Sequence, residues 1–125
     1  SAADMKYPAE KLKEAGNEQI ILTEQGTMMS PGNLVVDFRN IPSLKLHGYP
    51  VVMDCTHSVQ QPGGAATTGG NRNYIAPIAL AAKAFGAKGY FFEVHPDPDK
   101  ALSDGPNMLF LNKFEDLVNQ IIATS

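Results

Sequence analysis

With 125 residues, 43% of them hydrophobic, the chain can bury one modest core, and its composition excludes a disordered or fibrous protein. The net charge of -3, with scattered Lys and Arg, offers no basic stripe for a nucleic-acid backbone, so we expect no nucleic-acid partner. No apolar run approaches the roughly 20 residues that span a bilayer and no signal peptide is visible, so we expect a cytoplasmic protein without a membrane partner. The single cysteine, Cys55, excludes an internal disulfide.

Apolar periodicity and turn residues predict alternating strands and helices. In chain order we expect a helix at 4–14, a strand at 19–23, a loop at 24–33, a strand at 34–36, an irregular or briefly helical stretch at 37–46, a strand at 50–54, a long loop at 58–71, a helix at 72–85, a strand at 88–94 and a helix at 112–123. Asp4 and Asn112 are the expected helix caps. The turn signal within the first loop is Ser30-Pro31-Gly32-Asn33.

Three of these strands are predicted to be buried, and each is followed directly by polar side chains. The strand at 50–54 leads to His57, the strand at 88–94 ends around Glu93, and the strand at 19–23 leads to Gln25. This pattern indicates an α/β fold with about three βα units whose functional loops share one face, as in a (β/α)8 barrel. A complete barrel needs about 250 residues, so we expect this chain to be part of a longer protein.

One imidazole and two carboxylates are the candidate metal ligands. His57, Glu93 and Asp104 together suit a divalent ion such as Zn, Fe or Mn. Their spacing is not that of a standard local metal motif, and each has a plainer explanation. A structural histidine is the alternative for His57, although its position at a strand end favours function. The alternatives are a buried, paired carboxylate for Glu93 and a turn aspartate in Ser103-Asp104-Gly105 for Asp104.

The Gly-rich loop before the helix at 72–85 has two interpretations. Its backbone N–H groups, with Arg72 at the helix start, suit a phosphate group, or the loop is a flexible connector. Loops of this length in compact domains are usually functional. Cys55 is most simply a small buried residue of the core.

Several motifs resemble those of the 3-deoxy-D-manno-octulosonate 8-phosphate synthase family. They are Asn33-Leu34-Val35-Val36-Asp37, Asp54-x-Thr56-His57-Ser58-Val59-Gln60 and Gly69-Gly70-x-Arg72. The stretch from Glu93 to Pro106 also occurs in related 3-deoxy-heptulosonate phosphate synthases, so it identifies only the superfamily. The resemblance covers essentially the whole chain. It implies that residues 1–125 are the C-terminal portion of a single TIM-barrel catalytic domain, with the last three strands of the barrel.

The resemblance also implies an activity and its site. The family condenses phosphoenolpyruvate with arabinose 5-phosphate to give 3-deoxy-D-manno-octulosonate 8-phosphate and phosphate, for lipopolysaccharide synthesis, and forms homo-oligomers, by resemblance tetramers. His57 and Asp104 would be catalytic, and His57, Glu93 and Asp104 would bind metal in the metal-dependent class. The implied substrate-binding residues are Gln25, Asn33, Ser58, Gln60 and Arg72. A fourth metal ligand, a Cys of the first barrel strand, is not matched by Cys55, so the metal-independent class, with no cofactor, stays open.

Two departures from the family keep other functions open. The family has Arg, within Glu-Arg-Gly, where this chain has Gln25, and loss of that charge-assisted phosphate contact costs roughly 1.5–3 kcal/mol. The family's Phe-Gly-Tyr-Asn-Asn is replaced by Met29-Ser30-Pro31-Gly32-Asn33. The alternatives are an impaired or silent barrel half that acts as a structural or binding module, and a related heptulosonate synthase. We expect residues 1–125 alone to be inactive and not stably folded, because their open strand edges seek partners.

Overall fold

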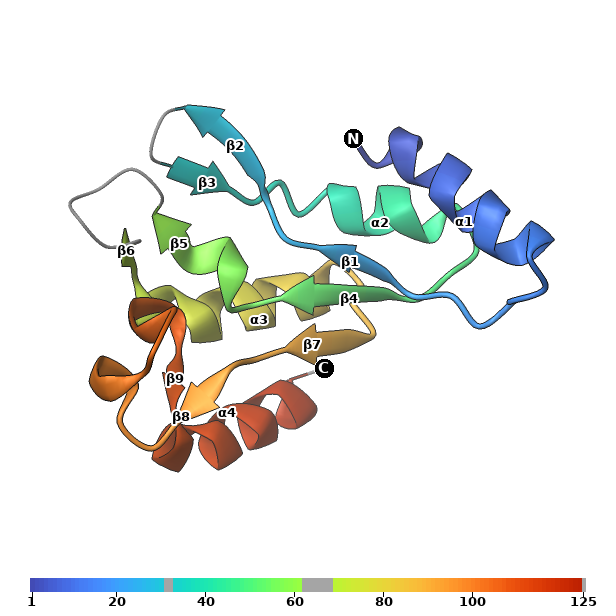
Figure 1. Cartoon of the computed structure of the whole chain (residues 1–125). Coiled ribbons are helices and arrows are strands. Elements are labelled where there is room, and N and C mark those ends of the chain that lie inside the picture. Colours follow the sequence, from blue (N-terminus) through green and yellow to red (C-terminus); the bar gives the residue numbers. More distant parts are fainter. Residues whose placement is uncertain (31–32, 62–68, 125) are drawn as a thin grey trace.

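The structure is a computed structural model that describes residues 1–30, 33–61 and 69–124 (Figure 1). Its helices and strands are, in chain order, α1 Lys6–Glu14, β1 Leu22–Glu24, β2 Thr27–Ser30, β3 Asn33–Val35, α2 Asn40–Lys45, β4 Val51–Asp54, β5 Gln60–Gln61, β6 Gly69–Gly70, α3 Ile75–Ala84, β7 Gly89–Phe91, β8 Val94–His95, β9 Leu109–Phe110 and α4 Leu111–Ala123. Short 3-10 helices lie at Ala3–Met5, His57–Val59, Arg72–Tyr74, Pro98–Lys100 and Gly105–Asn107.

Within the described residues, β1, β4 and β7 form a parallel sheet in the order β1-β4-β7 (Figure 1). Helix α2 connects the first two strands and α3 the next two, so consecutive strands of the chain are neighbours in the sheet. This is the arrangement of successive βα units in a (β/α)8 barrel. The predicted fold class, part of such a barrel, is confirmed.

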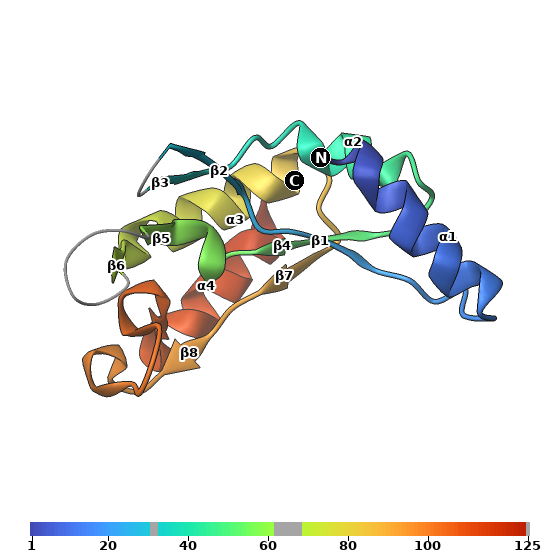
Figure 2. The same cartoon turned by 45° about the horizontal axis from the view of Figure 1, so that its top comes forward.

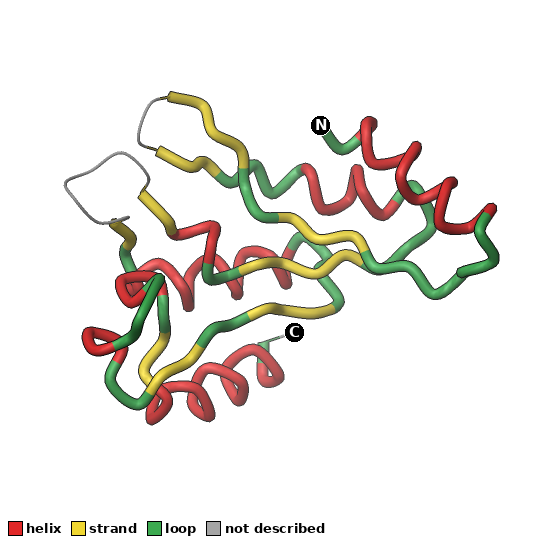
Figure 3. Tube along the Cα trace, viewed as in Figure 1, coloured by secondary structure: helices red, strands yellow, loops and turns green. Residues whose placement is uncertain are grey.

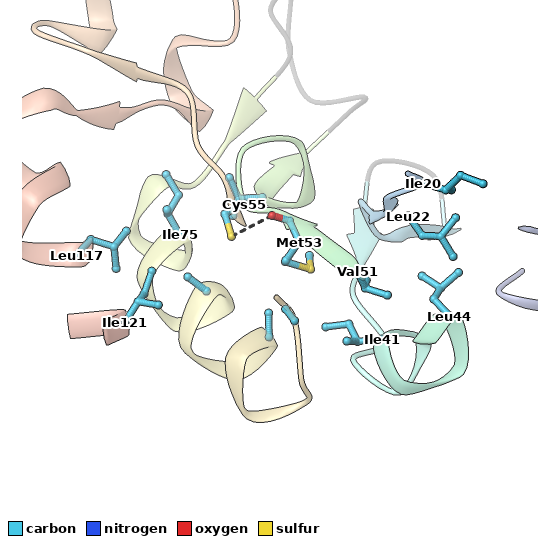
Figure 4. Close-up of a cluster of buried hydrophobic side chains, with 14 of the residues drawn as sticks. Ile20, Leu22, Ile41, Leu44, Val51, Met53, Cys55, Ile75, Leu117 and Ile121 are labelled. Carbon is cyan, nitrogen blue, oxygen red and sulfur yellow. Dashed lines mark hydrogen bonds between the residues drawn. The ribbon is translucent and has the colours of Figure 1, made fainter. Parts of the chain in front are cut away.

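The core lies between one face of this sheet and the helices (Figure 4). Because strand side chains alternate, Leu22, Val51 and Met53 all point to the helical side. Ile41 of α2 and Ile75 of α3 pack there and are almost completely buried. Burial of each such side chain contributes about 1.5–3 kcal/mol to folding, so this layer fixes how the strands and their following loops are arranged.

No described element covers the opposite face of the sheet. Thr23 and Phe91 on that face are exposed, and Val52 between them is only half-buried. The expectation of three buried strands therefore holds for the helical face of β4 but not for β7, whose residues are half-buried or exposed. In a closed barrel this uncovered face would point to the interior.

The segments that follow the three strands all lie at one end of the sheet (Figures 2 and 3). The β2–β3 hairpin follows β1, the 3-10 helix His57–Val59 follows β4, and β8 follows β7. In Figure 1 the hairpin and the β8–β9 pair lie at the carboxyl ends of the strands, and Figure 2 shows the hairpin and β8 at the same end. The fold therefore gathers the polar strand ends that the sequence singled out.

Both predicted helix caps are wrong. Asp4 does not precede the helix, because the backbone is already helical from Ala2, and its carboxylate binds the amino group and hydroxyl of Ser1 instead. Asn112 lies inside α4, since pairing of β9 with β8 keeps the chain extended to Phe110 and the helix begins at Leu111. Neither α1 nor α4 has a side-chain N-cap hydrogen bond.

The loop predicted at 24–33 is largely a hairpin. Strands β2 and β3 pair antiparallel, with Thr27 opposite Val35. Residues 31–32 of the predicted turn and residues 62–68 of the predicted long loop lie outside the described residues. Within the described part of the chain, no helix combines the length and apolar character required to cross a bilayer.

Candidate functional site

Three side chains meet beyond the ends of β4 and β7. The Nε2 atom of His57 lies 3.8 Å from Oε1 of Glu93 and 3.7 Å from Oδ2 of Asp104. One potential ligand atom of each residue lies within 4.8 Å of the others, and all three residues are half-buried. The structure thus brings together the three residues that were predicted as metal ligands, although they come from three different segments of the chain.

The imidazole of His57 is oriented by Asp54, the last residue of β4. Its Nδ1 atom lies 2.9 Å from Oδ2 of Asp54, while Oδ1 accepts hydrogen bonds of 2.9 Å from the backbone N–H groups of Thr56 and His57. Partial burial by itself would lower the pKa of His57, but the hydrogen bond to Asp54 and the surrounding carboxylates outweigh it and raise that pKa. The ring also stacks on Phe91, with centroids 6.3 Å apart.

The backbone of Glu93 is fixed from both sides. Its N–H donates a 2.7 Å hydrogen bond to the buried hydroxyl of Thr56, and its carbonyl accepts one of 3.0 Å from the backbone N–H of Leu109. The first bond connects it to the segment after β4, and the second to β9. The backbone position of Glu93 is therefore set by two segments that are distant from it in sequence.

Asp104 has a left-handed backbone, with φ 55° and ψ 17°, and among the described residues no other non-glycine has positive φ. Such a conformation costs of order 1 kcal/mol and occurs preferentially at functional sites. Its carbonyl accepts a hydrogen bond of 2.9 Å from the backbone N–H of Asn107. Gly105 is buried against the carbonyl of Pro98, so the turn that carries Asp104 leaves no room for a larger residue there.

Arg72 is engaged by the same turn region. Its Nη2 atom donates to Oδ1 of Asp99 at 3.0 Å and to the carbonyl of Gly105 at 3.2 Å. Its guanidinium carbon lies 4.8 Å from the centroid of the Phe110 ring. In this structure Arg72 therefore connects the start of α3 to the loop that carries Asp104. Its predicted contact with substrate stays a prediction.

The other predicted substrate-binding residues follow β1 and β4 and are not among the three candidate ligands. Ser58 and Gln60 line a cavity of about 260 Å³ whose described lining includes none of those ligands. The Ser58 hydroxyl is buried and has no hydrogen-bond partner among the described residues. Gln25 is exposed directly after β1, and Asn33 begins β3, where its backbone pairs with that of Ser30.

The donor set of His57, Glu93 and Asp104 fits a divalent cation. Imidazole nitrogen with two carboxylate oxygens is a combination typical of Zn, Fe and Mn sites. Among the described lysines and arginines, none forms an ion pair with Glu93 or Asp104, so two negative charges face each other across His57. Cys55 is not part of this set, because it is fully buried in the core with Sγ 3.7 Å from the carbonyl of Met53 (Figure 4).

Sequence reasoning did not identify Asp54 and Thr56 as site residues. Both precede His57 at the end of β4, and both act by hydrogen bonds to atoms of the ligand residues rather than by facing the site themselves. The available signal was the spacing of Asp54 three residues before His57, because an aspartate often accepts hydrogen bonds from backbone N–H groups a few residues ahead.

Comparison with known sequences places these residues in a family. A sequence model described as the DAHP synthetase I family matches residues 1–124. Proteins called "2-dehydro-3-deoxyphosphooctonate aldolase" are similar over nearly the whole chain. That of Desulfatibacillum aliphaticivorans is 51% identical over 121 residues, that of Syntrophobacter fumaroxidans 51% over 120, and that of Cyanothece sp. 46% over 121. The aligned part is 95–96% of this chain but only 42–44% of each relative.

A solved structure supports the same relationship. The crystal structure of phospho-2-dehydro-3-deoxyheptonate aldolase (DAHP synthase) from Thermotoga maritima superposes with a TM-score of 0.78 at 32% identity. The match covers 98% of this chain and 34% of that one. The resemblance seen in the sequence motifs is thus confirmed by relatives of both kinds. With the family match extending over residues 1–124, the chain belongs to the DAHP synthetase I family.

Proposed function

We propose that the protein carrying this chain condenses phosphoenolpyruvate with arabinose 5-phosphate to form 3-deoxy-D-manno-octulosonate 8-phosphate and phosphate. The observation that carries the proposal is the meeting of His57, Glu93 and Asp104 at the carboxyl ends of parallel strands, in a chain about 50% identical to proteins named for the octonate product. Active sites of (β/α)8 barrels lie at that end of the barrel.

The chain would be the C-terminal portion of one barrel domain. In support, its sheet has an uncovered face, and it spans less than half the length of its curated relatives. The proposed setting is cytoplasmic synthesis of a lipopolysaccharide precursor by a homo-oligomer, a tetramer by family resemblance, with small-molecule partners and neither nucleic acid nor membrane.

The chemistry requires a new carbon–carbon bond and the loss of phosphate. C3 of phosphoenolpyruvate attacks the sugar aldehyde, water adds at C2, and phosphate leaves, so each turnover consumes one water. His57 would position that water or accept its proton, and Glu93 and Asp104 would complete the polar site. In the metal-dependent class, His57, Glu93 and Asp104 would hold a Zn, Fe or Mn ion, which supplies a Lewis acid when bound.

Phosphate release and product mass test this activity. In every experiment below, the full-length protein is the complete product of the gene that encodes this chain. With phosphoenolpyruvate and arabinose 5-phosphate it should release one phosphate per eight-carbon product. The His57→Ala variant should lose roughly 10²–10⁴-fold in rate. His47→Ala is the matched control, because the His47 ring contacts the carbonyl of Ala2 and not the three candidate ligands. A correctly folded protein with no turnover would overturn the proposal.

Two other functions are separated by the same assay. The similarity to a heptonate aldolase from Thermotoga maritima favours, as the second candidate, a seven-carbon product. That product needs a four-carbon aldose phosphate in place of the five-carbon one, so comparison of the two sugars distinguishes the candidates. A silent barrel half used as a structural or binding module, suggested by Gln25 in place of the family's Arg, would turn over neither sugar.

A further inference from the structure

Asp54 uses its two carboxylate oxygens for different purposes. Oδ1 accepts from the backbone N–H groups of Thr56 and His57, and so shapes the turn after β4. Oδ2 lies 2.9 Å from Nδ1 of the His57 ring. The Asp54 side chain is only 10% exposed, so these three contacts are largely shielded from water. Oδ1 therefore stabilises the backbone turn, and Oδ2 contacts the imidazole ring.

The contact with Oδ2 determines which ring nitrogen carries hydrogen. An ionised carboxylate only accepts hydrogen bonds, so Nδ1 of His57 must be the N–H that donates. In the neutral imidazole, Nε2 then has no hydrogen and carries a free lone pair, and this atom lies 3.8 Å from Oε1 of Glu93 and 3.7 Å from Oδ2 of Asp104. A divalent cation requires a nitrogen in that state. Hydrogen bonds that the distal ring nitrogen donates to a carboxylate orient metal-binding histidines in many proteins.

We propose that Asp54 is a positioning residue that sets the orientation and the tautomer of His57, so that Nε2 is presented to a divalent cation held with Glu93 and Asp104. The inference rests on the metal-dependent form of the proposed function. Asp54 does not itself reach the cation site in this arrangement, because both of its oxygens are occupied on the side of β4.

The variant Asp54→Asn separates the two purposes. Asparagine keeps an oxygen that can accept from the two backbone N–H groups, but it places an NH₂ donor where Oδ2 was. Nδ1 of His57 must then accept, which moves the ring hydrogen to Nε2 and blocks that nitrogen for a metal. Asp54→Ala removes both purposes. The matched control is Asp116→Asn on α4, which makes the same change of charge at an exposed position.

The experiment uses the full-length protein and two readouts that do not require turnover. Nitrogen NMR of the metal-free protein, at a pH above the raised pKa of His57 where the ring is neutral, assigns the tautomer of His57, and competition with a chelating dye measures the affinity for Zn²⁺. In Asp54→Asn, we expect the Nδ1 and Nε2 signals to exchange character and the Zn²⁺ affinity to fall on the order of 10- to 100-fold. The thermal unfolding midpoint should stay close to that of Asp116→Asn, whereas Asp54→Ala should lower it.

Failure of the inference differs from failure of the proposed function. An Asp54→Asn protein with unchanged ring signals or unchanged Zn²⁺ affinity would overturn the inference, even if the wild type makes the expected product. A wild type that binds no Zn²⁺ would overturn it too. If instead the wild type has no synthase activity but Asp54→Asn shows the tautomer change and the weaker Zn²⁺ binding, the inference stands and the proposed function is wrong.

Discussion

The hydroxyl of Thr56 accepts a hydrogen bond of 2.7 Å from the backbone N–H of Glu93, directly beyond the point where β4 and β7 stop pairing. The last backbone hydrogen bond before it, between the chain segments of β4 and β7, is the 2.9 Å bond from the N–H of Cys55 to the carbonyl of Phe91. A side chain thus continues the sheet by one more connection. Since His57 follows Thr56, this bond fixes the distance between the segments that carry two of the three candidate ligands.

Thr56→Val should therefore destabilise the full-length protein. Valine has nearly the same shape, but it leaves the Glu93 N–H without its partner, and a buried unsatisfied N–H costs about 1–3 kcal/mol. Urea denaturation measures this as a lower midpoint with an unchanged slope. Thr56→Ser keeps the hydroxyl and should recover most of the loss. An equal fall of the urea midpoint in the serine and valine variants would show that packing of the methyl group, and not the hydrogen bond, stabilises the junction between the two segments.

Gly105→Ala should displace the turn that carries Asp104. A Cβ at position 105 would lie 2.4 Å from the carbonyl oxygen of Pro98, so the backbone must move. Strain of this kind typically costs about 1–3 kcal/mol, and we expect weaker Zn²⁺ binding together with a lower unfolding midpoint. Ser103→Ala, at an exposed position two residues earlier, is the control. Wild-type values for both quantities in Gly105→Ala would contradict the tight contact seen here.

The convergence of His57 and Glu93 could be predicted from the sequence. Both follow apolar strands, and the carboxyl ends of parallel strands meet at one edge of a sheet, so local pattern and topology are sufficient. The β2–β3 hairpin was predicted only in part, because the predicted strand at 34–36 overlaps β3 while β2 lies in the segment predicted as a loop. The segment that forms β2 is short and lacks the strict alternation of apolar and polar residues that indicates a strand.

Specific side-chain contacts, some local and some between distant segments, account for part of what the sequence did not predict. The interpretation of Arg72 as an anion ligand stays a prediction, but its bonds to residues 27 and 33 positions later in the chain could not be foreseen from its position before a helix. Asp4 was a reasonable cap by residue type, but competition from Ser1 and a helical backbone at Ala2 decided otherwise. Local propensity predicts neither the contacts of Arg72 nor those of Asp4.

Lys83 of α3 stabilises the C-terminal end of α4. Its Nζ atom donates to the carbonyls of Ile121 and Thr124 and lies 3.5 Å from that of Ile122. The last carbonyls of a helix have no partner within it and carry partial negative charge, so an ammonium group there is favourable. Lys83→Met should lower the free energy of unfolding by about 0.5–1.5 kcal/mol. Lys88→Met, at an exposed position, is the control. An equally large fall in the free energy of unfolding in this control would show that the effect comes from the change in net charge.

Cys55 should be unreactive in the folded protein. Burial, with a smaller contribution from the charge of Asp54, raises the pKa of its thiol to about 12, so very little thiolate is present between pH 7 and 9. Only the thiolate attacks alkylating reagents. Mass spectrometry should therefore detect no iodoacetamide adduct at Cys55 after treatment of the native protein across this range, and complete modification in 8 M urea. Rapid modification of the native protein would show that the β4 end of the core opens.

Gln25→Arg tests whether the departure from the family weakens phosphoenolpyruvate binding. Gln25 is exposed directly after β1, at the same end of the sheet as the three candidate ligands. If the phosphate of phosphoenolpyruvate binds there, as in the family, arginine would restore a planar, permanently charged donor where only a neutral amide is now available.

The expected result is a Michaelis constant for phosphoenolpyruvate that falls roughly tenfold or more, because about 1.4 kcal/mol corresponds to a factor of ten. The Michaelis constant for the sugar phosphate should change little, because the new arginine would contact only the phosphate of phosphoenolpyruvate. Gln25→Lys is the matched comparison, as it adds the charge without the planar fork and should recover less of the affinity. Equal constants in wild type and Gln25→Arg would mean that another cation already binds the phosphate and that Gln25 is a compensated substitution rather than a defect.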